Sequence, residues 1–284
     1  MFPLTVQDLC KNYPSFQLKD VSFTVRSGEI MGFIGRNGAG KTTTLKCLLN
    51  FVHPDGGQVR FFDMPLEQAE QEIKQRIGFV SGGVDAYTRK KLDDLTAVTK
   101  RFYPNWDDGA YQRFIQRFAL DGQKTQRQLS AGMRVKYALA LAMSHHAELL
   151  ILDEPTSGLD PVSRDDLLDE FLALAREGVS ILFSTHITSD LDKCADGITY
   201  IHNGQVHASM PLQDFVGGYR FLTLPDLPES ARPYLLGAKP AKTGYTALIR
   251  TQDAQRLGLS GEPATLETVM IHLEKEAPHE KSAL

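Results

Sequence analysis

Gly35-Arg36-Asn37-Gly38-Ala39-Gly40-Lys41-Thr42 has the complete pattern of a phosphate-binding loop, and it directly follows an apolar run at residues 30–34. Glycines let the backbone curl so that successive N–H groups can surround phosphate oxygens. Lys41 can then reach the β- and γ-phosphates, and the Thr42 hydroxyl can hold Mg²⁺. From Thr43 to Asn50 we expect a helix whose N-terminus directs partial positive charge at the same anion. The stretch predicts nucleotide binding, a property shared by kinases, GTPases, helicases and transport ATPases.

Composition places the chain among ordinary globular proteins. It has 284 residues, of which 42% are apolar and 23% charged, enough for one large domain and a smaller appendage. Lys and Arg number 31 against 35 Asp and Glu, a net charge of −4. Because nucleic-acid binding needs a basic surface, we expect no nucleic-acid partner.

The sequence predicts a cytoplasmic protein that reaches a membrane only through a partner. Its first residues have no basic stretch followed by an apolar one, so we expect no secretory signal. Spanning a bilayer takes roughly 20 consecutive apolar residues, and no run approaches that length. Cys10, Cys47 and Cys194 are odd in number and far apart, which favours reduced thiols over disulfides or a metal site.

Strand-like and helical segments alternate along the chain, which predicts an α/β fold with a largely parallel sheet. The strand candidates are residues 29–34, 59–62, 77–80, 149–152 and 179–184. Upstream, residues 4–9, 16–18 and 21–25 look like short antiparallel strands. Residues 198–201 and 205–209 around Asn203-Gly204 favour a hairpin.

Two regions depart from this alternation. Between about residues 84 and 145 helical spacing takes over, for example in the apolar series Tyr111, Phe114, Ile115 and Phe118, so we expect an inserted helical subdomain. After Gly217-Gly218 the chain changes to short strands punctuated by proline and a final helix at about 266–275. The predicted domains are therefore residues 1–217 and an accessory region at 218–284.

An acidic pair ends one of the predicted strands. Residues 147–152 are apolar, and Asp153-Glu154 follows at their carboxyl end. Beside a phosphate loop, the first carboxylate can orient Mg²⁺ and the second can accept a proton from the water that attacks the γ-phosphate. A helix cap or a solvated turn is the alternative use of such a pair.

Three further segments fall into order with the loop and the acidic pair: Leu129-Ser130-Ala131-Gly132-Met133, Ser157-Gly158-Leu159-Asp160 and Ser184-Thr185-His186. From about residue 4 to 217 the combination resembles the nucleotide-binding subunit of an ATP-binding-cassette (ABC) transporter. The resemblance implies a P-loop NTPase (RecA-like) core with an antiparallel β-subdomain, an inserted α-helical subdomain and a small C-terminal accessory tail. It also implies ATP and Mg²⁺ as the bound groups.

The resemblance assigns roles to individual residues. Asp153 becomes the carboxylate associated with Mg²⁺, Glu154 the general base, and His186 the residue that contacts the γ-phosphate. Tyr13 stands where the family places an aromatic ring against adenine. Each has a structural alternative, since a histidine at a strand end or a tyrosine at a strand edge can serve packing alone.

Ser130 and Gly132 lie in the segment that, by the resemblance, faces the phosphate loop of a second copy in a head-to-tail dimer. Ser130 offers a hydroxyl and Gly132 a bare N–H at a helix N-terminus; an N-capped helix is the simpler alternative. The family's usual Leu-Ser-Gly-Gly-Gln is changed here by Ala131 and by Met133, which cannot donate an amide hydrogen bond. The common glutamine after residues 77–81 is replaced by Gly82, with Gly83 and Asp85 beyond it.

The resemblance also implies partners. An integral membrane permease subunit would dock on the helical insertion, where residues 102–107 supply Phe102, Tyr103 and Trp106; these aromatics could equally form the insertion's own core. The export branch of the family is the closer match, and a homodimer or a heterodimer with a related ATPase is open. The alternative function is an ABC ATPase that transports nothing and acts as a switch. A small-molecule kinase would leave residues 129–133 and His186 unexplained.

Overall fold

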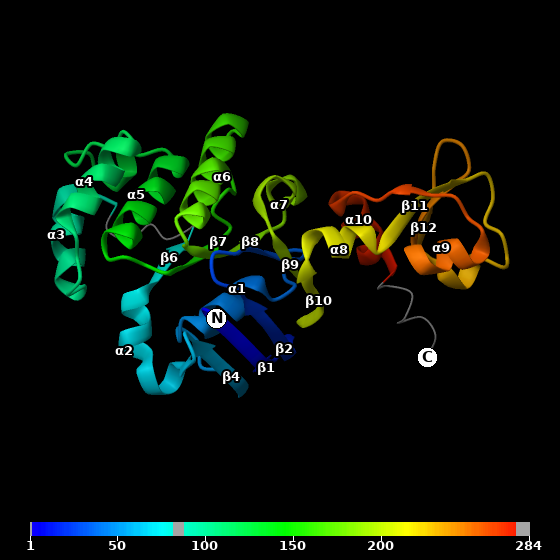
Figure 1. Ribbon diagram of the computed structural model, residues 1–284, viewed down its shortest axis with the longest axis horizontal. Helices are drawn as coiled ribbons and strands as arrows, with labels where there is room; N and C mark the ends of the chain where they lie inside the picture. Colours follow the sequence, from blue (N-terminus) through cyan, green and yellow to red (C-terminus); the bar gives the residue numbers. More distant parts are fainter. Residues whose placement is uncertain (1, 82–87, 277–284) are drawn as a thin grey trace. The chain divides into compact units, whose positions relative to one another are not determined.

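The computed structural model describes residues 2–81 and 88–276, and the chain forms two compact units, residues 1–209 and 210–284 (Figure 1). The second unit begins eight residues before the boundary expected after 217. It includes helix α8 (Leu212–Gly217), whose Phe215 ring contacts Tyr219 at a centroid distance of 5.8 Å. The domain division at 217 stays a prediction.

A six-stranded sheet in the order β10-β9-β3-β8-β7-β6 is the centre of the first unit. Its strands are β3 (Ile30–Ile34), β6 (Ile77–Ser81), β7 (Leu149–Asp153), β8 (Ser180–Thr185), β9 (Gly197–His202) and β10 (Gln205–Pro211). The pairs β6–β7, β7–β8 and β8–β3 are parallel, as expected. The strand β9, expected only as part of a hairpin, also pairs parallel with β3. Ile34 pairs with Thr185, and Asp153 with Ser184, so the carboxyl ends of β3, β7 and β8 share one edge.

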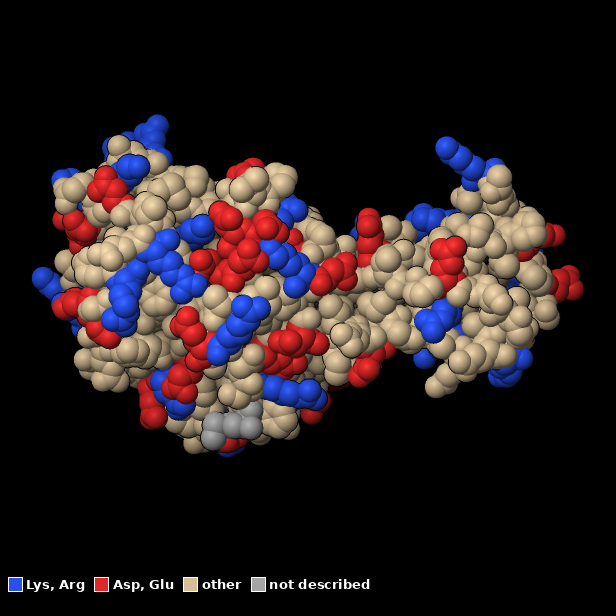
Figure 2. Space-filling model, turned by 45° about the horizontal axis from the view of Figure 1, so that its top comes forward, with Lys and Arg blue, Asp and Glu red and all other residues tan. Residues whose placement is uncertain are grey.

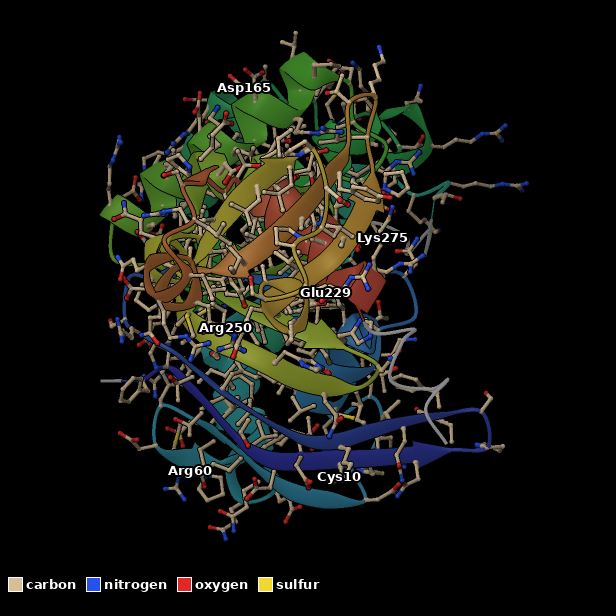
Figure 3. The ribbon with its side chains drawn as sticks, turned by 90° about the vertical axis from the view of Figure 1, so that its right-hand side faces the viewer. Cys10, Arg60, Asp165, Glu229, Arg250 and Lys275 are labelled. Atoms are coloured by element: carbon tan, nitrogen blue, oxygen red, sulfur yellow. The ribbon has the colours of Figure 1, made fainter. Side chains whose placement is uncertain are left out.

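A second, antiparallel sheet in the order β2-β1-β4-β5 comprises β1 (Leu4–Tyr13), β2 (Phe16–Val25), β4 (Gly56–Phe61) and β5 (Met64–Pro65). The strand at 59–62 was expected in the parallel sheet, and that expectation is wrong: β4 pairs antiparallel with β1. Its alternation explains this, because Val59 and Phe61 are buried while Arg60 between them is partly exposed. Such alternation is typical of an antiparallel sheet with one solvated face. In Figure 3, Cys10 on β1 and Arg60 on β4 mark this sheet.

A hydrophobic core joins the two sheets of the first unit. Phe23 of β2 stacks on Phe33 of β3 at 5.3 Å, and Leu45 of helix α1 (Lys41–Leu48) is buried in the same cluster. Further helices of this unit are α2 (Leu66–Arg76), α6 (Pro161–Arg176) and α7 (Thr188–Cys194). The core thus anchors both strand β3 before the loop and helix α1 after it.

The helices expected between 84 and 145 are present in the described part of that region. They are α3 (Leu92–Thr99), α4 (Asp108–Arg117) and α5 (Ala131–Ser144), with single 3-10 turns at Lys100–Phe102 and Gln126–Gln128. The buried Thr96 hydroxyl lies 2.9 Å from the hydroxyls of both Tyr111 and Tyr137, so one polar node ties the three helices together.

The second unit is an antiparallel sheet in the order β12-β13-β11-β14 with flanking helices. Its strands are β11 (Tyr219–Leu224), β12 (Leu235–Pro240), β13 (Tyr245–Arg250) and β14 (Glu262–Pro263), and its other helices are α9 (Thr251–Leu257) and α10 (Leu266–Glu276) with a 3-10 turn at Arg232–Tyr234. Helix α10, expected at about 266–275, buries Leu266 and Val269 and also His272, whose Nδ1 lies 2.8 Å from the Gly237 carbonyl.

Candidate functional site

The phosphate loop lies between β3 and the first turn of α1, which begins at Lys41. Gly40 has a φ of 115°, and a Cβ there would stand 2.6 Å from Leu18 Cδ2. Gly35 is needed for a different reason, since its Cβ would stand 2.2 Å from the Ile201 carbonyl oxygen. The loop is therefore held between the β9–β10 hairpin and β2, where only glycine fits.

Lys41 is a nearly buried cation, with a side chain 6% exposed. Its Nζ donates to the carbonyl of Gly35 at 2.7 Å and lies 3.4 Å from that of Arg36. Glu154 Oε1 is 3.3 Å away. The ammonium group thus lies inside the loop, in a position to bind an anion.

Thr42 and Asp153 face one another across the loop and the end of β7. The Thr42 hydroxyl donates to Asp153 Oδ1 at 3.3 Å, and the Ser184 hydroxyl donates to the same oxygen at 2.7 Å. A hydroxyl and a carboxylate are hard oxygen donors of the kind that Mg²⁺ prefers beside phosphates. The donor set fits a magnesium ion.

Glu154 and His186 form the third contact of the site, with Glu154 Oε2 and His186 Nδ1 2.8 Å apart. Glu154 has a φ of 51°, in the left-handed region that is uncommon for residues with a Cβ. Its backbone N–H donates to Ser184 Oγ at 3.0 Å. The carboxylate of Glu154 therefore lies between a lysine and a histidine.

A cavity of about 860 Å³ opens over these groups. Its lining consists of Tyr13, Pro14, Ser15, Phe16, Arg36, Asn37, Gly38, Gly40, Lys41, Thr42, Thr43, Glu154, Ser157 and His186. The volume is within the range of small-molecule sites in proteins. The cavity brings most of the predicted loop residues together with Tyr13, Glu154 and His186; Gly35 and the buried Ala39 lie in the loop behind it.

The lining of this cavity does not include Ser130 or Gly132. Ser130 is the N-cap of α5, and its Oγ accepts a hydrogen bond from Met133 N at 3.2 Å. Gly132 is buried near Leu159 and Ser163. Both residues therefore start α5 as expected, away from the nucleotide cavity of their own chain. Gly82, Gly83 and Asp85 lie outside the described residues.

A buried acidic residue next to the site was not anticipated. Asp190 of α7 is 1% exposed, and Thr156 donates to its Oδ2 at 2.6 Å. Arg164 Nε lies 3.9 Å from Asp190 Oδ1, and both atoms are buried with no hydrogen-bond partner among the described residues. Burial raises the pKa of Asp190. Thr156 and Asp190 thus connect the segment after Glu154 with the helix after His186.

Ser184 and Asp190 carried only weak signals in the sequence. Ser184 is a polar residue near the end of an otherwise apolar strand, and Asp190 follows His186 by four residues. The roles of Ser184 and Asp190 depend on the atoms with which they form hydrogen bonds. Those partners lie some 30 residues away in sequence.

The aromatic residues at 102–107 differ in their surroundings: some pack inside the helical insertion and one is exposed. Tyr103 stacks on His145 with ring centroids 3.8 Å apart, and Trp106 packs 5.6 Å from Tyr111. Phe102, in contrast, is 70% exposed. Two of the three aromatics serve internal packing, and one remains on the surface.

Comparison with known proteins supports the resemblance that the sequence motifs indicate. The ABC transporter family pattern matches residues 18–157. Over 208 residues the chain is 33% identical to the bacitracin transport ATP-binding protein BcrA of Bacillus licheniformis, covering 72% of this chain and 68% of that protein. It is 32% identical over 190 residues to the Nod factor export ATP-binding protein I of Burkholderia lata, covering 65% of this chain and 62% of that protein.

The fold agrees with these similarities. A solved structure described as the ATP binding subunit of an ABC transporter superposes with a TM-score of 0.67 at 28% identity, over 74% of this chain and 90% of that one. The predicted P-loop NTPase fold is thereby confirmed. The chain therefore belongs to the ABC transporter family, as one of its ATP-binding and ATP-hydrolysing subunits.

Proposed function

We propose that this subunit hydrolyses ATP·Mg²⁺ at the edge where β3, β7 and β8 end, and that it powers export through a separate membrane permease. One observation carries the proposal: Lys41, Thr42, Glu154 and His186, which follow the ends of three separate strands, line one cavity of about 860 Å³. Asp153, at the end of β7, adjoins it through its hydrogen bond with Thr42. The rest of the mechanism follows from what each side chain can do there.

Lys41 neutralises charge on the β- and γ-phosphates, because its buried ammonium is already within 3.3 Å of one anion, Glu154. The loop N–H groups and the α1 N-terminus bind the phosphate oxygens. Thr42 and Asp153 hold Mg²⁺, which when bound neutralises developing charge on the phosphates. Arg36, Asn37, Gly38 and Thr43 complete the lining, and Tyr13 offers a ring face to the base.

Glu154 accepts the proton of the attacking water, and His186 fixes where the carboxylate points. A carboxylate can take up that proton on either oxygen, while the 2.8 Å contact with His186 Nδ1 restrains Oε2. Lys41 Nζ lies 3.3 Å from Glu154 Oε1. When ATP binds, Lys41 moves toward the phosphates, and Oε1 becomes available to accept the proton of the water. His186 also stands in the cavity lining, and we infer that it contacts the terminal phosphate there.

Ser130 and Gly132 complete the site of a second copy in an ATP-dependent dimer. Their position at the start of α5, outside the cavity lining of their own chain, supports this arrangement. The 14-residue helix behind them directs its N-terminal partial charge at the partner's γ-phosphate. A homodimer of this chain accounts for these features without a second kind of subunit. The heterodimer is tested by mixing this protein with a related ATPase.

The permease docks at a hollow of about 530 Å³ lined by Glu70, Gln71, Lys74, Gln75, Phe102 and Tyr103. Phe102 is the exposed anchor there, and Gln75 Nε2 donates to its carbonyl at 3.1 Å. A short permease helix with an apolar face suits such a hollow. None of the described helices has the length and apolar composition needed to cross a bilayer. Because the proposed permease lies in the membrane, docking on it places the subunit at the inner membrane face.

The distribution of charge on one face of the first unit (Figure 2) supports a protein partner over a nucleic acid. On the face of the first unit drawn in Figure 2, acidic and basic side chains are interspersed. Lys193, for example, is paired with Asp165 and Asp169 at 2.5 and 2.8 Å. Export as the direction is supported by the likeness to the Nod factor export protein.

The test is purification of tagged Glu154→Gln protein from native membranes with ATP·Mg²⁺, with Glu229→Gln as the matched carboxylate control in the second unit. We expect the Glu154 variant to lose turnover and to retain a polytopic permease, and the Glu229 variant to behave as wild type. Rapid hydrolysis by Glu154→Gln refutes the base assignment. Recovery of only soluble or single-span proteins favours an ABC ATPase that acts as a switch without transport.

A further inference from the structure

Ser184 is a fully buried hydroxyl at the centre of the site, and both of its hydrogen bonds have a defined direction. Its Oγ lies 2.7 Å from Asp153 Oδ1 and 3.0 Å from Glu154 N. An ionised carboxylate only accepts and a backbone N–H only donates. The hydroxyl therefore donates to Asp153 and accepts from Glu154, and one side chain of β8 binds two consecutive residues of β7 and the turn after it.

Glu154 needs such support because its backbone is in an unfavourable conformation. Its φ of 51° brings Cβ close to a carbonyl oxygen, which costs free energy for any residue other than glycine. Pro155 restricts the preceding residue further. Strained conformations of this kind persist only where the surroundings enforce them, and they gather at functional sites.

The strand register explains why Ser184 is the residue that enforces the left-handed conformation of Glu154. Asp153 is the last residue of β7 and pairs with Ser184 of β8. Glu154 lies one residue beyond β7, and a side chain instead of the sheet receives its N–H. A second bond, from Ser157 N to the Glu154 carbonyl at 3.2 Å, holds the other side of the same residue.

We propose that Ser184 is a positioning residue for hydrolysis: its hydroxyl holds Glu154 in the left-handed conformation that directs the carboxylate at His186. The inference rests on the proposed role of Glu154 as the base. Without the hydroxyl, Glu154 relaxes toward ordinary backbone angles and its carboxylate shifts relative to the attacking water. Misplacement of a reacting group by about 1 Å is enough to lower turnover roughly 100-fold.

Strand β8 itself provides a matched control. Ser180 is 1% exposed, and its hydroxyl also accepts a backbone N–H, that of Gly28, at 2.9 Å. It lies at the opposite end of β8 from the site. Ser180→Ala and Ser184→Ala thus remove the same atoms from the same strand, with equal burial, and only one of them touches Glu154.

The experiment compares steady-state ATP hydrolysis and thermal unfolding of wild type, Ser184→Ala and Ser180→Ala in the full chain. We expect both variants to lose a similar few degrees of Tm, about 2–4 °C. Ser184→Ala should lose at least 10-fold in kcat, with KM for ATP within about twofold of wild type, whereas Ser180→Ala keeps its kcat. Equal kcat for Ser184→Ala and wild type, or equal losses in the two variants, overturns the proposal.

Two further measurements locate the effect. In a Glu154→Gln background, Ser184→Ala should lower kcat no further, because the residue acts through Glu154; an additional 10-fold loss contradicts that route. Excess Mg²⁺ should not restore Ser184→Ala, and restoration would assign the hydroxyl to Asp153 instead. If Glu154→Gln itself hydrolyses ATP normally, the base assignment fails, and that outcome is separate from the comparison of Ser184 with Ser180.

Discussion

Tyr103 and His145 stack face to face, with ring centroids 3.8 Å apart and ring planes within 9° of parallel. The imidazole Nδ1 also lies 3.1 Å from the carbonyl of Gln75 in α2. His145 thus connects the helical insertion to the nucleotide-binding core. Burial is the main cause that lowers its pKa, to about 4, with a smaller contribution from the neighbouring His146.

Stability should therefore fall in mild acid through His145. The unfolded chain takes up a proton near pH 6.5 and the folded one only near pH 4, so between these values unfolding is favoured by proton uptake. The stabilisation is fully present above pH 6.5 and decreases by about 3 kcal/mol as the pH falls to 4. Urea unfolding at pH 7, 5.5 and 4.5 should show this loss in wild type relative to His145→Phe; parallel pH curves would contradict it.

The Thr96 hydroxyl should matter for the helical insertion far more than its size suggests. Thr96→Val removes the hydrogen bonds that its hydroxyl makes with the Tyr111 and Tyr137 hydroxyls, both in buried residues. Tyr137 keeps its bond to the Leu92 carbonyl, and the change should lower the unfolding free energy by about 1–3 kcal/mol. Fluorescence of Trp106, which packs on Tyr111, reports the change. Thr99→Val, on the same helix but partly exposed, should stay within about 0.5 kcal/mol of wild type.

Gly40 should tolerate a methyl group less well than a glycine of similar backbone conformation. Gly178 has a φ of 95° with no atom within 4 Å of an added Cβ, so Gly178→Ala meets only backbone strain, about 1–2 kcal/mol. Gly40→Ala adds close contact with Leu18 and Phe16, which should cost roughly 1 kcal/mol more. Chemical unfolding without nucleotide measures both; an equal cost would mean that the contact relaxes freely.

Thr156 and Asp190 should be energetically coupled. Thr156→Val removes the 2.6 Å donor of a carboxylate that is 1% exposed, and the loss of this hydrogen bond to a buried charge should cost about 3 kcal/mol. Asp190→Asn removes the charge, so the same Thr156 substitution should cost less in that background. A double-mutant cycle by urea unfolding should give a coupling of about 1–3 kcal/mol; strictly additive losses would refute it.

Much of the fold could be predicted from local patterns in the sequence. The string from Gly35 to Thr42 needs only its own glycines and the flanking strand and helix, so a phosphate loop between β3 and α1 could be predicted without tertiary information. Apolar runs fully buried on both faces, such as β7, likewise identify strands of a parallel sheet. Helical spacing of apolar residues located α4.

Sheet membership and hydrogen-bond partners were decided by tertiary structure. The strand at residues 59–62 was expected in the parallel sheet, and its pairing with β1 places β4 in the antiparallel one. Ser184, Asp190 and Thr96 act through atoms on distant segments, and a polar residue inside an apolar run does not reveal its partner. The left-handed backbone of Glu154 has the same origin: the amino-acid type disfavours it, and contacts from Ser184 enforce it. Sequence determined the local elements because their causes are local, whereas the geometry among catalytic groups depends on long-range packing.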